Sequence, residues 1–170
     1  MEQFDILDID GTPTGLTASR GAKLADGQYY LGSHTYIYNS SNEFLLQQRA
    51  YTKAFLPGGW DIHMGHVMAG ETSKASMVRE IEEEIGLIIP EDELTFVGRV
   101  IWEQYHHMID VYFLKIDFDI KKLTLPPEEV IEAKSVCVDE MLALVENMDY
   151  RPVEYRRLVA GEICKLRCSI

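Results

Sequence analysis

The feature that most constrains this chain is a helical pattern with apolar residues on one side and glutamates on the other. Between Thr72 and Ile85, apolar residues recur at positions 77, 78, 81 and 85, which places them on one face of an α-helix. Gly86 follows at the position where a left-handed residue ends a helix. The sequence therefore predicts a helix over 72–85 that packs one face against a core.

The same helix carries an acidic cluster. Glu80, Glu83 and Glu84 are separated by steps of three and four, so their carboxylates are expected to project from one helix face. Like charges at this spacing destabilise a helix by roughly a few tenths of a kcal/mol per pair. A hard cation such as Mg²⁺, bound by carboxylates and phosphate oxygens, would offset that repulsion. Taken alone, the cluster is more typical of a solvated acidic surface than of a metal site.

The residues around the helix favour a metal site over a solvated acidic surface. A glycine, five residues, a glutamate, seven residues and an Arg-Glu pair lead into the acidic cluster, and a Gly-Leu pair closes it. This span, 65–87, resembles the Nudix box at every fixed position. The matching residues are Gly65, Glu71, Arg79, Glu80, Ile81, Glu83, Glu84, Gly86 and Leu87. The resemblance implies an α/β (α+β) fold, specifically an α/β/α sandwich around a mixed β-sheet, and an enzyme that cleaves diphosphate bonds.

The resemblance also implies roles for the box residues. The three helix glutamates would bind Mg²⁺ or Mn²⁺, with Glu80 and Glu83 taking part in catalysis. Gly65 would offer its backbone carbonyl to a metal ion. Arg79 would orient a glutamate of the box, and Glu71 would either support the metal ligands or be linked to the metal itself. The metal would neutralise the diphosphate and lower the pKa of the attacking water.

The general base and the substrate contacts remain open at this stage. In such enzymes the base often lies outside the box. The candidates for the base are Glu103, Glu128 and Glu129. The candidates for substrate binding are His66, Arg49 and Trp60, and for His66 a substrate contact and an ordinary hydrogen bond weigh equally.

Looser motifs over residues 5–145 resemble isopentenyl diphosphate isomerase and the hydrolases related to it. The isomerase needs a cysteine where this chain has Met64, and a thioether cannot exchange a proton. No histidine lies between Arg20 and His34, where the isomerase has metal ligands. His106 and His107 replace its acidic pair; both are expected at the surface, and at most one could face the site. Hydrolysis is therefore favoured over isomerisation.

A third alternative is a Nudix module that binds a nucleotide or diphosphate without turning it over. Such modules usually lack box glutamates, and this chain keeps them all. The substrate is expected to be a nucleoside diphosphate derivative or another small organic diphosphate. Many small enzymes of the family are homodimers, and the sequence leaves that open.

Charge and composition exclude several other classes. The net charge is −12, with 28 acidic and 16 basic residues, so stable nucleic-acid binding is not expected. The most basic stretch, 151–167, is interpreted as a solvated helix face. No apolar run approaches the roughly 20 residues that span a membrane, and no signal-peptide pattern opens the chain. A cytoplasmic protein is expected, with Cys137, Cys164 and Cys168 as core thiols.

The remaining pattern predicts one domain over 1–170. Residues 1–30 are expected to form a hairpin, with its turn at Asp10-Gly11, and an edge extension. Residues 148–170 are expected to hold the C-terminal helix, over 153–168. Asp139 is the expected N-cap of a helix over 139–147. The other expected strands are 34–38, 43–49, 93–102, 108–118 and 135–138.

Overall fold

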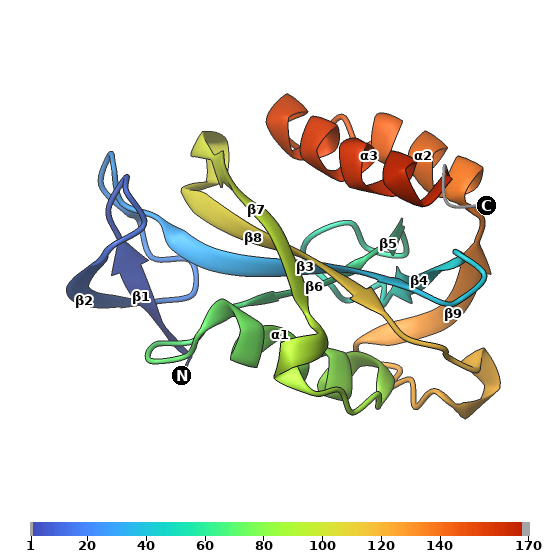
Figure 1. The fold of residues 1–170 in the computed structure, drawn as a ribbon. Helices are drawn as coiled ribbons and strands as arrows, with labels where there is room; N and C mark the ends of the chain where they lie inside the picture. Colours follow the sequence, from blue (N-terminus) through green and yellow to red (C-terminus); the bar gives the residue numbers. More distant parts are fainter. Residues whose placement is uncertain (1, 168–170) are drawn as a thin grey trace.

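The computed structural model describes residues 2–167, in which a seven-stranded mixed sheet lies between helices (Figure 1). The order is β5-β4-β3-β8-β7, with β6 paired to β3 and β9 paired to β4. Strands β3 and β8 run parallel, and every other pair in the sheet is antiparallel. The strands are β3 (Tyr30–Tyr38), β4 (Phe44–Arg49), β5 (Trp60–Asp61), β6 (His63–His66), β7 (Thr95–Trp102), β8 (His107–Lys115) and β9 (Val130–Val136).

Helices cover both faces of this sheet (Figure 1). Helix α1 (Ser73–Ile85) lies on one face, and α2 (Val138–Glu146) and α3 (Val153–Arg167) lie on the other. Each helical layer has its own core: fully buried Tyr36 packs in the same cluster as residues of α2 and α3, and Ile37 packs in the cluster of α1. Adjacent strand residues point to opposite faces, so β3 serves both cores. The expected α/β/α sandwich around a mixed sheet is confirmed.

Helix α1 follows its sequence pattern closely. Thr72 caps its start, with the side-chain hydroxyl accepting a 3.1 Å hydrogen bond from the Ala75 N–H. Gly86 ends it at a φ of 68°, in the left-handed region that glycine adopts readily. Met77 and Ile81 on the apolar face are fully buried, each contributing about 1.5–3 kcal/mol.

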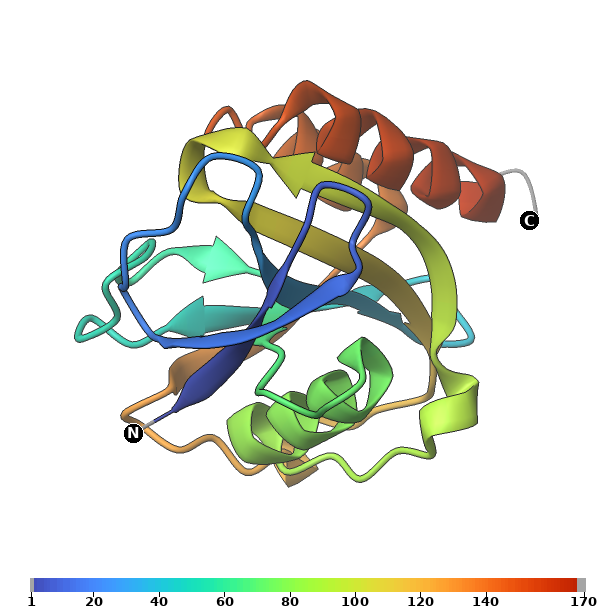
Figure 2. The same ribbon diagram turned by 90° about the vertical axis from the view of Figure 1, so that its left-hand side faces the viewer.

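The N-terminal hairpin is a separate two-stranded sheet formed by β1 (Gln3–Leu7) and β2 (Pro13–Ser19). In the predicted turn, Gly11 has a φ of 80°. Leu7 and Tyr29 join the hairpin to the start of β3 through backbone hydrogen bonds of 2.9 and 3.0 Å. Figure 2 shows this hairpin in front of the central sheet.

Several boundaries differ from the sequence prediction. Strand β3 begins four residues before the predicted His34, and β9 covers 130–136 rather than 135–138. The N-cap of α2 is Cys137, not Asp139, because the Glu140 carboxylate turns back to accept from the Cys137 N–H at 2.9 Å. Helix α3 begins at Val153 as predicted, and residues 148–152, which were assigned to the C-terminal helical segment, belong to the connection after α2. Short 3-10 turns complete the chain: η1 (Glu91–Glu93), η2 (Glu103–Tyr105) and η3 (Ile120–Lys122).

Two expectations about individual side chains are wrong. Cys137 and Cys164 are exposed free thiols rather than core residues, and Cys168 lies outside the described residues.

Within residues 2–167, no helix is both long and apolar enough to cross a membrane.

Candidate active site

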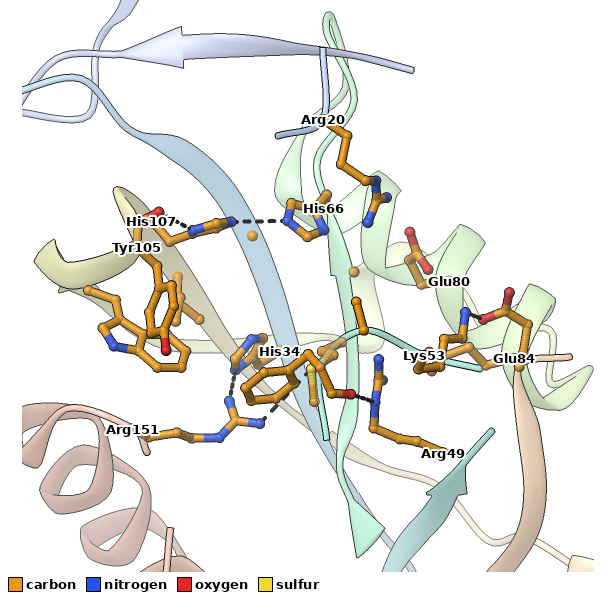
Figure 3. Close-up of a pocket in the computed structure, with 18 residues that line it drawn as sticks. Arg20, His34, Arg49, Lys53, His66, Glu80, Glu84, Tyr105, His107 and Arg151 are labelled. Carbon is orange, nitrogen blue, oxygen red and sulfur yellow. Dashed lines mark hydrogen bonds and ion pairs between the residues drawn. The ribbon is translucent and has the colours of Figure 1, made fainter. Parts of the chain in front are cut away.

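A cavity of about 570 Å³ opens beside β6 and the end of the hairpin. Side chains of β3, β6 and β8 form its floor, and α1 supplies acidic groups to one wall. The loop between β4 and β5 and the turn η2 supply much of the rest (Figure 3). The box helix therefore meets the sheet at a hollow large enough for a small ligand.

Gly65 and Glu80 are in the closest contact along the acidic wall. A Cβ atom added to Gly65 would overlap the Glu80 side chain, so only glycine lets this carboxyl lie against the backbone of β6. Burial raises the pKa of Glu80 to about 7, and the charges of Glu84 and Glu83 add to that rise, while Arg79 opposes it. The negative charge of Glu80 is costly here unless a cation compensates it.

Glu84 lies deeper than the sequence suggested and is only 5% exposed. Its Oε2 accepts a 2.8 Å hydrogen bond from Gln47 Nε2 on β4. His63 Nδ1 on β6 lies 3.3 Å from the same oxygen. Side chains from β4 and β6 thus hold this carboxylate at the edge of the cavity.

Arg79 connects the other acidic residues of the box. It donates to both carboxylate oxygens of Glu71, at 3.0 and 3.1 Å, and to Glu80 at 2.9 Å. It also reaches Glu83 at 3.3 Å, although the Glu83 side chain is 58% exposed and does not line the cavity. The three helix glutamates thus differ in exposure, because Glu84 is buried against the sheet whereas Glu83 is largely exposed to solvent.

The donor atoms in this wall suit a hard divalent cation. The Glu80 carboxylate lies against Gly65, Glu84 lines the same cavity, and oxygen ligands are what Mg²⁺ prefers. Within residues 2–167, no three His, Cys, Asp or Glu side chains are already arranged to hold a metal ion. Arg79 instead occupies the space between Glu71, Glu80 and Glu83 as their shared cationic partner.

Basic side chains face the acidic wall. Arg20 extends from the end of the hairpin toward Glu80, and Arg49 and Lys53 approach from β4 and the loop after it (Figure 3). Arg49 Nε donates a 2.9 Å hydrogen bond to the Phe55 carbonyl, which fixes its position. A protein of net charge −12 therefore has a locally cationic patch in this cavity.

Only one of the three base candidates lies in the cavity. Glu129 lines it and forms an ion pair with Lys53. Glu103 is not part of the lining, and its carboxylate accepts a 2.9 Å hydrogen bond from the Tyr29 hydroxyl. Glu128 is exposed and also outside the lining.

Aromatic residues form the wall away from the carboxylates. Phe55, Trp102 and Tyr105 line it, and the rings of Trp102 and Tyr105 meet edge to face with centroids 4.7 Å apart. Trp60 is not among the lining residues, and Lys134 lies 4.2 Å above its ring. Of the three substrate-binding candidates, the structure brings His66 and Arg49 to the cavity and leaves Trp60 outside.

The sequence matches the NUDIX domain family over residues 31–156. The chain belongs to the Nudix family. It is 34% identical over 156 residues to a protein of Listeria monocytogenes named an uncharacterized Nudix hydrolase, with 89% of each chain covered. This Nudix chain is thus an enzyme of the hydrolase family that acts on diphosphate compounds.

Two further comparisons place the branch and the fold. Isopentenyl-diphosphate Delta-isomerase of Escherichia coli is 29% identical over 98 residues, which is 57% of this chain and 54% of the isomerase. The crystal structure of DR0079 from Deinococcus radiodurans superposes with a TM-score of 0.72 at 18% identity, covering 96% of this chain and 98% of that one. The isomerase match bears out the predicted branch, and the structural match shows a shared fold.

Two histidines of the Nudix cavity are paired with each other. His66 Nε2 lies 3.0 Å from His107 Nε2. Burial lowers the pKa of His66 to about 3, with the charges of His107 and Arg20 adding to the effect. The expected surface position of His107 is wrong, whereas His106 turns away and lies 3.1 Å from the Gln28 carbonyl.

A buried charged network beneath the cavity was not predicted. Arg151, assigned from sequence to a solvated helix face, is fully buried in its side chain and donates to both oxygens of Asp61, at 2.9 and 2.8 Å. It also lies 2.7 Å from His34 Nδ1. The only hint in the sequence is Pro152, which separates Arg151 from the amphipathic pattern of α3.

Proposed function

We propose that this Nudix hydrolase cleaves the diphosphate bond of a nucleoside diphosphate derivative or another small organic diphosphate, with Mg²⁺ or Mn²⁺ as its cofactor. The observation that carries the proposal is that one cavity is lined by the carboxylates of Glu80 and Glu84 and by the basic side chains of Arg49 and Lys53 (Figure 3). Carboxylates recruit divalent cations, and arginine and lysine bind phosphate oxygens. A site with charges of only one sign could not bind both the divalent cation and the phosphate groups.

The proposed metal ligands are Glu80, Glu83, Glu84 and the Gly65 carbonyl. Glu80 and Glu84 line the cavity, and Glu83 shares the cationic partner Arg79 with Glu80. When bound, the metal lowers the pKa of the attacking water and neutralises the phosphates. Glu71 acts through Arg79, which it holds with two hydrogen bonds.

Residues that face the carboxylate wall are proposed to bind the phosphates and to accept the proton. Arg49 and Lys53 would hold the non-bridging phosphate oxygens and so keep the diphosphate in line with the attacking water. Water attacks one phosphorus, the bond to the bridging oxygen breaks, and the water proton passes to a carboxylate. Glu129 is the proposed acceptor of that proton, because it is the one base candidate of the three that lines the cavity.

The proposal includes action in a reducing cytoplasm. Cys137 and Cys164 are exposed free thiols in the described part of the chain. Such thiols remain reduced in the cytosol and form disulfides in oxidising compartments.

Turnover of a panel of diphosphates with Mg²⁺ tests the proposal. Glu83→Gln and Glu84→Gln should each lose most of the rate on the best substrate while keeping a native circular dichroism spectrum. Glu82→Gln is a matched control, since Glu82 belongs to the same helix but is exposed and outside the cavity. Near wild-type turnover by either test variant contradicts the site, and no turnover of any diphosphate contradicts the function.

A further inference from the structure

The contacts of His34 fix the position of its proton. Its Nδ1 lies 2.7 Å from Arg151 Nη1 and 2.9 Å from the Tyr155 hydroxyl. A guanidinium group only donates hydrogen bonds and does not lose its proton in proteins. Nδ1 must therefore carry the lone pair, and the neutral imidazole carries its hydrogen on Nε2.

The surroundings also hold His34 neutral. Burial lowers the pKa of His34 well below its usual range, and the adjacent positive charge of Arg151 lowers it further. Asp61 holds Arg151 in place through two hydrogen bonds between fully buried side chains. His34 thus has a fixed tautomer and a fixed charge over the physiological pH range.

The Nε2–H group faces the cavity. His34 lines the cavity floor on β3. Its Nε2 has no hydrogen-bond partner among residues 2–167. It is also absent from the fully buried polar atoms that lack a partner, so it remains accessible. The open space next to it is the cavity, so this donor is available to a ligand.

We propose that His34 is a specificity-determining residue that donates Nε2–H to an uncharged oxygen or nitrogen acceptor on the organic group of the substrate. The inference rests on the proposed function, because the metal wall, Arg49 and Lys53 then hold the diphosphate. The organic group must extend into the rest of the cavity, where His34 lies between those groups and Tyr105 (Figure 3). Arg151 is the positioning residue that keeps the donor in place.

This donor favours one substrate class over another. A polar group such as a nucleoside can accept the hydrogen bond, and a flat ring can pack on Trp102 and Tyr105. A hydrocarbon chain would exclude water and leave the donor unpaired, which weakens binding by about 5- to 150-fold. The cavity therefore selects nucleoside diphosphate derivatives over prenyl diphosphates.

The tautomer is tested first, without any substrate. Two-dimensional ¹H–¹⁵N spectra of the imidazole groups should show His34 as the neutral Nε2–H form from pH 6 to 8. Arg151→Met should allow both tautomers of His34 to be populated. A neutral Nδ1–H form or an imidazolium at pH 7 in the wild type overturns the inference, whatever the enzyme hydrolyses.

Selectivity is then measured as binding, separately from turnover. Calorimetry in Ca²⁺ buffer compares ADP-ribose, UDP-glucose and isopentenyl diphosphate. His34→Leu should weaken binding of the better nucleotide about 5- to 150-fold and leave isopentenyl diphosphate unchanged or tighter. His34→Gln keeps an N–H donor and should retain most of the preference.

The outcomes separate this inference from the proposed function. Binding that depends on His34 without any hydrolysis contradicts only the proposed function. Tighter wild-type binding of isopentenyl diphosphate, no binding of either nucleotide, or an equal loss for all ligands in His34→Leu overturns the role of His34. Equal losses in the Leu and Gln variants also overturn it, since they would indicate a packing role.

Discussion

Gln47 on β4 donates a 2.8 Å hydrogen bond from Nε2 to Oε2 of Glu84 on α1. Both side chains are buried, with exposed fractions of 1% and 5%. The bond joins the sheet to the acidic helix at the edge of the cavity, so the orientation of the Glu84 carboxylate depends on a strand that precedes the box. If Glu84 binds a metal, Gln47 fixes which of its oxygens remains available.

Gln47→Leu should therefore weaken the use of Mg²⁺. Loss of a partner that orients a metal ligand typically costs about 10- to 100-fold in metal affinity or activity. We expect the Mg²⁺ concentration for half-maximal rate to rise by about 10-fold or more. The rate is measured over a Mg²⁺ titration, and an unchanged midpoint would show that Glu84 needs no such support.

Arg151 and Asp61 should be strongly coupled in stability. Both side chains are fully buried, and removing one member of a buried ion pair costs about 3–5 kcal/mol. Arg151→Met and Asp61→Leu should each lower the free energy of unfolding by about that amount. The double variant should lose much less than the sum, because it leaves no unpaired buried charge. Urea unfolding of the four proteins measures the coupling, and additive losses would contradict it.

The sequence could predict α1 and the box because their signals are local. The spacing of Met77, Ile81 and Gly86 follows directly from helix geometry, and so does the grouping of the glutamates. That spacing could not show which glutamate the sheet covers. Glu84 is buried because Gln47 lies over it, and that contact joins residues 37 positions apart.

The cavity floor was missed for the same reason. His34 and Arg151 are 117 residues apart, and nothing near either one in the sequence predicts their contact. An arginine beside a basic helix is usually solvated, and only the connection between α2 and α3 turns this one inward. His107 likewise reaches the cavity because β8 pairs with β3 in parallel, which brings it opposite Tyr30.

The partly buried histidine His66 should make the protein sensitive to acid. Its folded pKa of about 3 lies below the ordinary value of 6.5, so the unfolded chain takes up a proton first as the pH falls. The stabilisation that depends on neutral His66 is present above about pH 6.5. It is lost as the pH falls, which lowers the free energy of unfolding by up to about 2 kcal/mol at pH 5. His66→Asn should show a smaller drop in melting temperature between pH 7 and pH 5, by about 4–8 °C. An equal drop in melting temperature for the wild type and the variant would contradict this.

Met64 should prevent isomerase chemistry. It lines the cavity, and its thioether can neither give nor take a proton. We expect no conversion of isopentenyl diphosphate to dimethylallyl diphosphate by the wild type. Met64→Cys should also be inactive, because the neighbouring His34 is a fixed neutral donor and not an acid. Product analysis by mass spectrometry after chromatographic separation checks both, and conversion by the pure wild type would refute the assignment.

Glu84→Gln should not destabilise the protein when metal is removed. Two unit charges about 4 Å apart repel by about 4 kcal/mol at an effective dielectric constant near 20, and the charge of Glu84 contributes to the raised pKa of Glu80. The amide oxygen of glutamine can still accept from Gln47. In EDTA, the variant is therefore expected to melt at the wild-type temperature or above it.

The response to Mg²⁺ should show whether Glu84 is a metal ligand or part of an acidic surface. A ligand that binds only the folded state stabilises it by mass action, so Mg²⁺ should raise the melting temperature of the wild type and raise that of Glu84→Gln much less. Glu82→Gln removes one charge from the exposed side of the same helix and should respond like the wild type. Screening of surface charge would shift all three proteins slightly and equally. Equal shifts would mean that Glu84 binds no metal, even though it occupies a ligand position of the Nudix box.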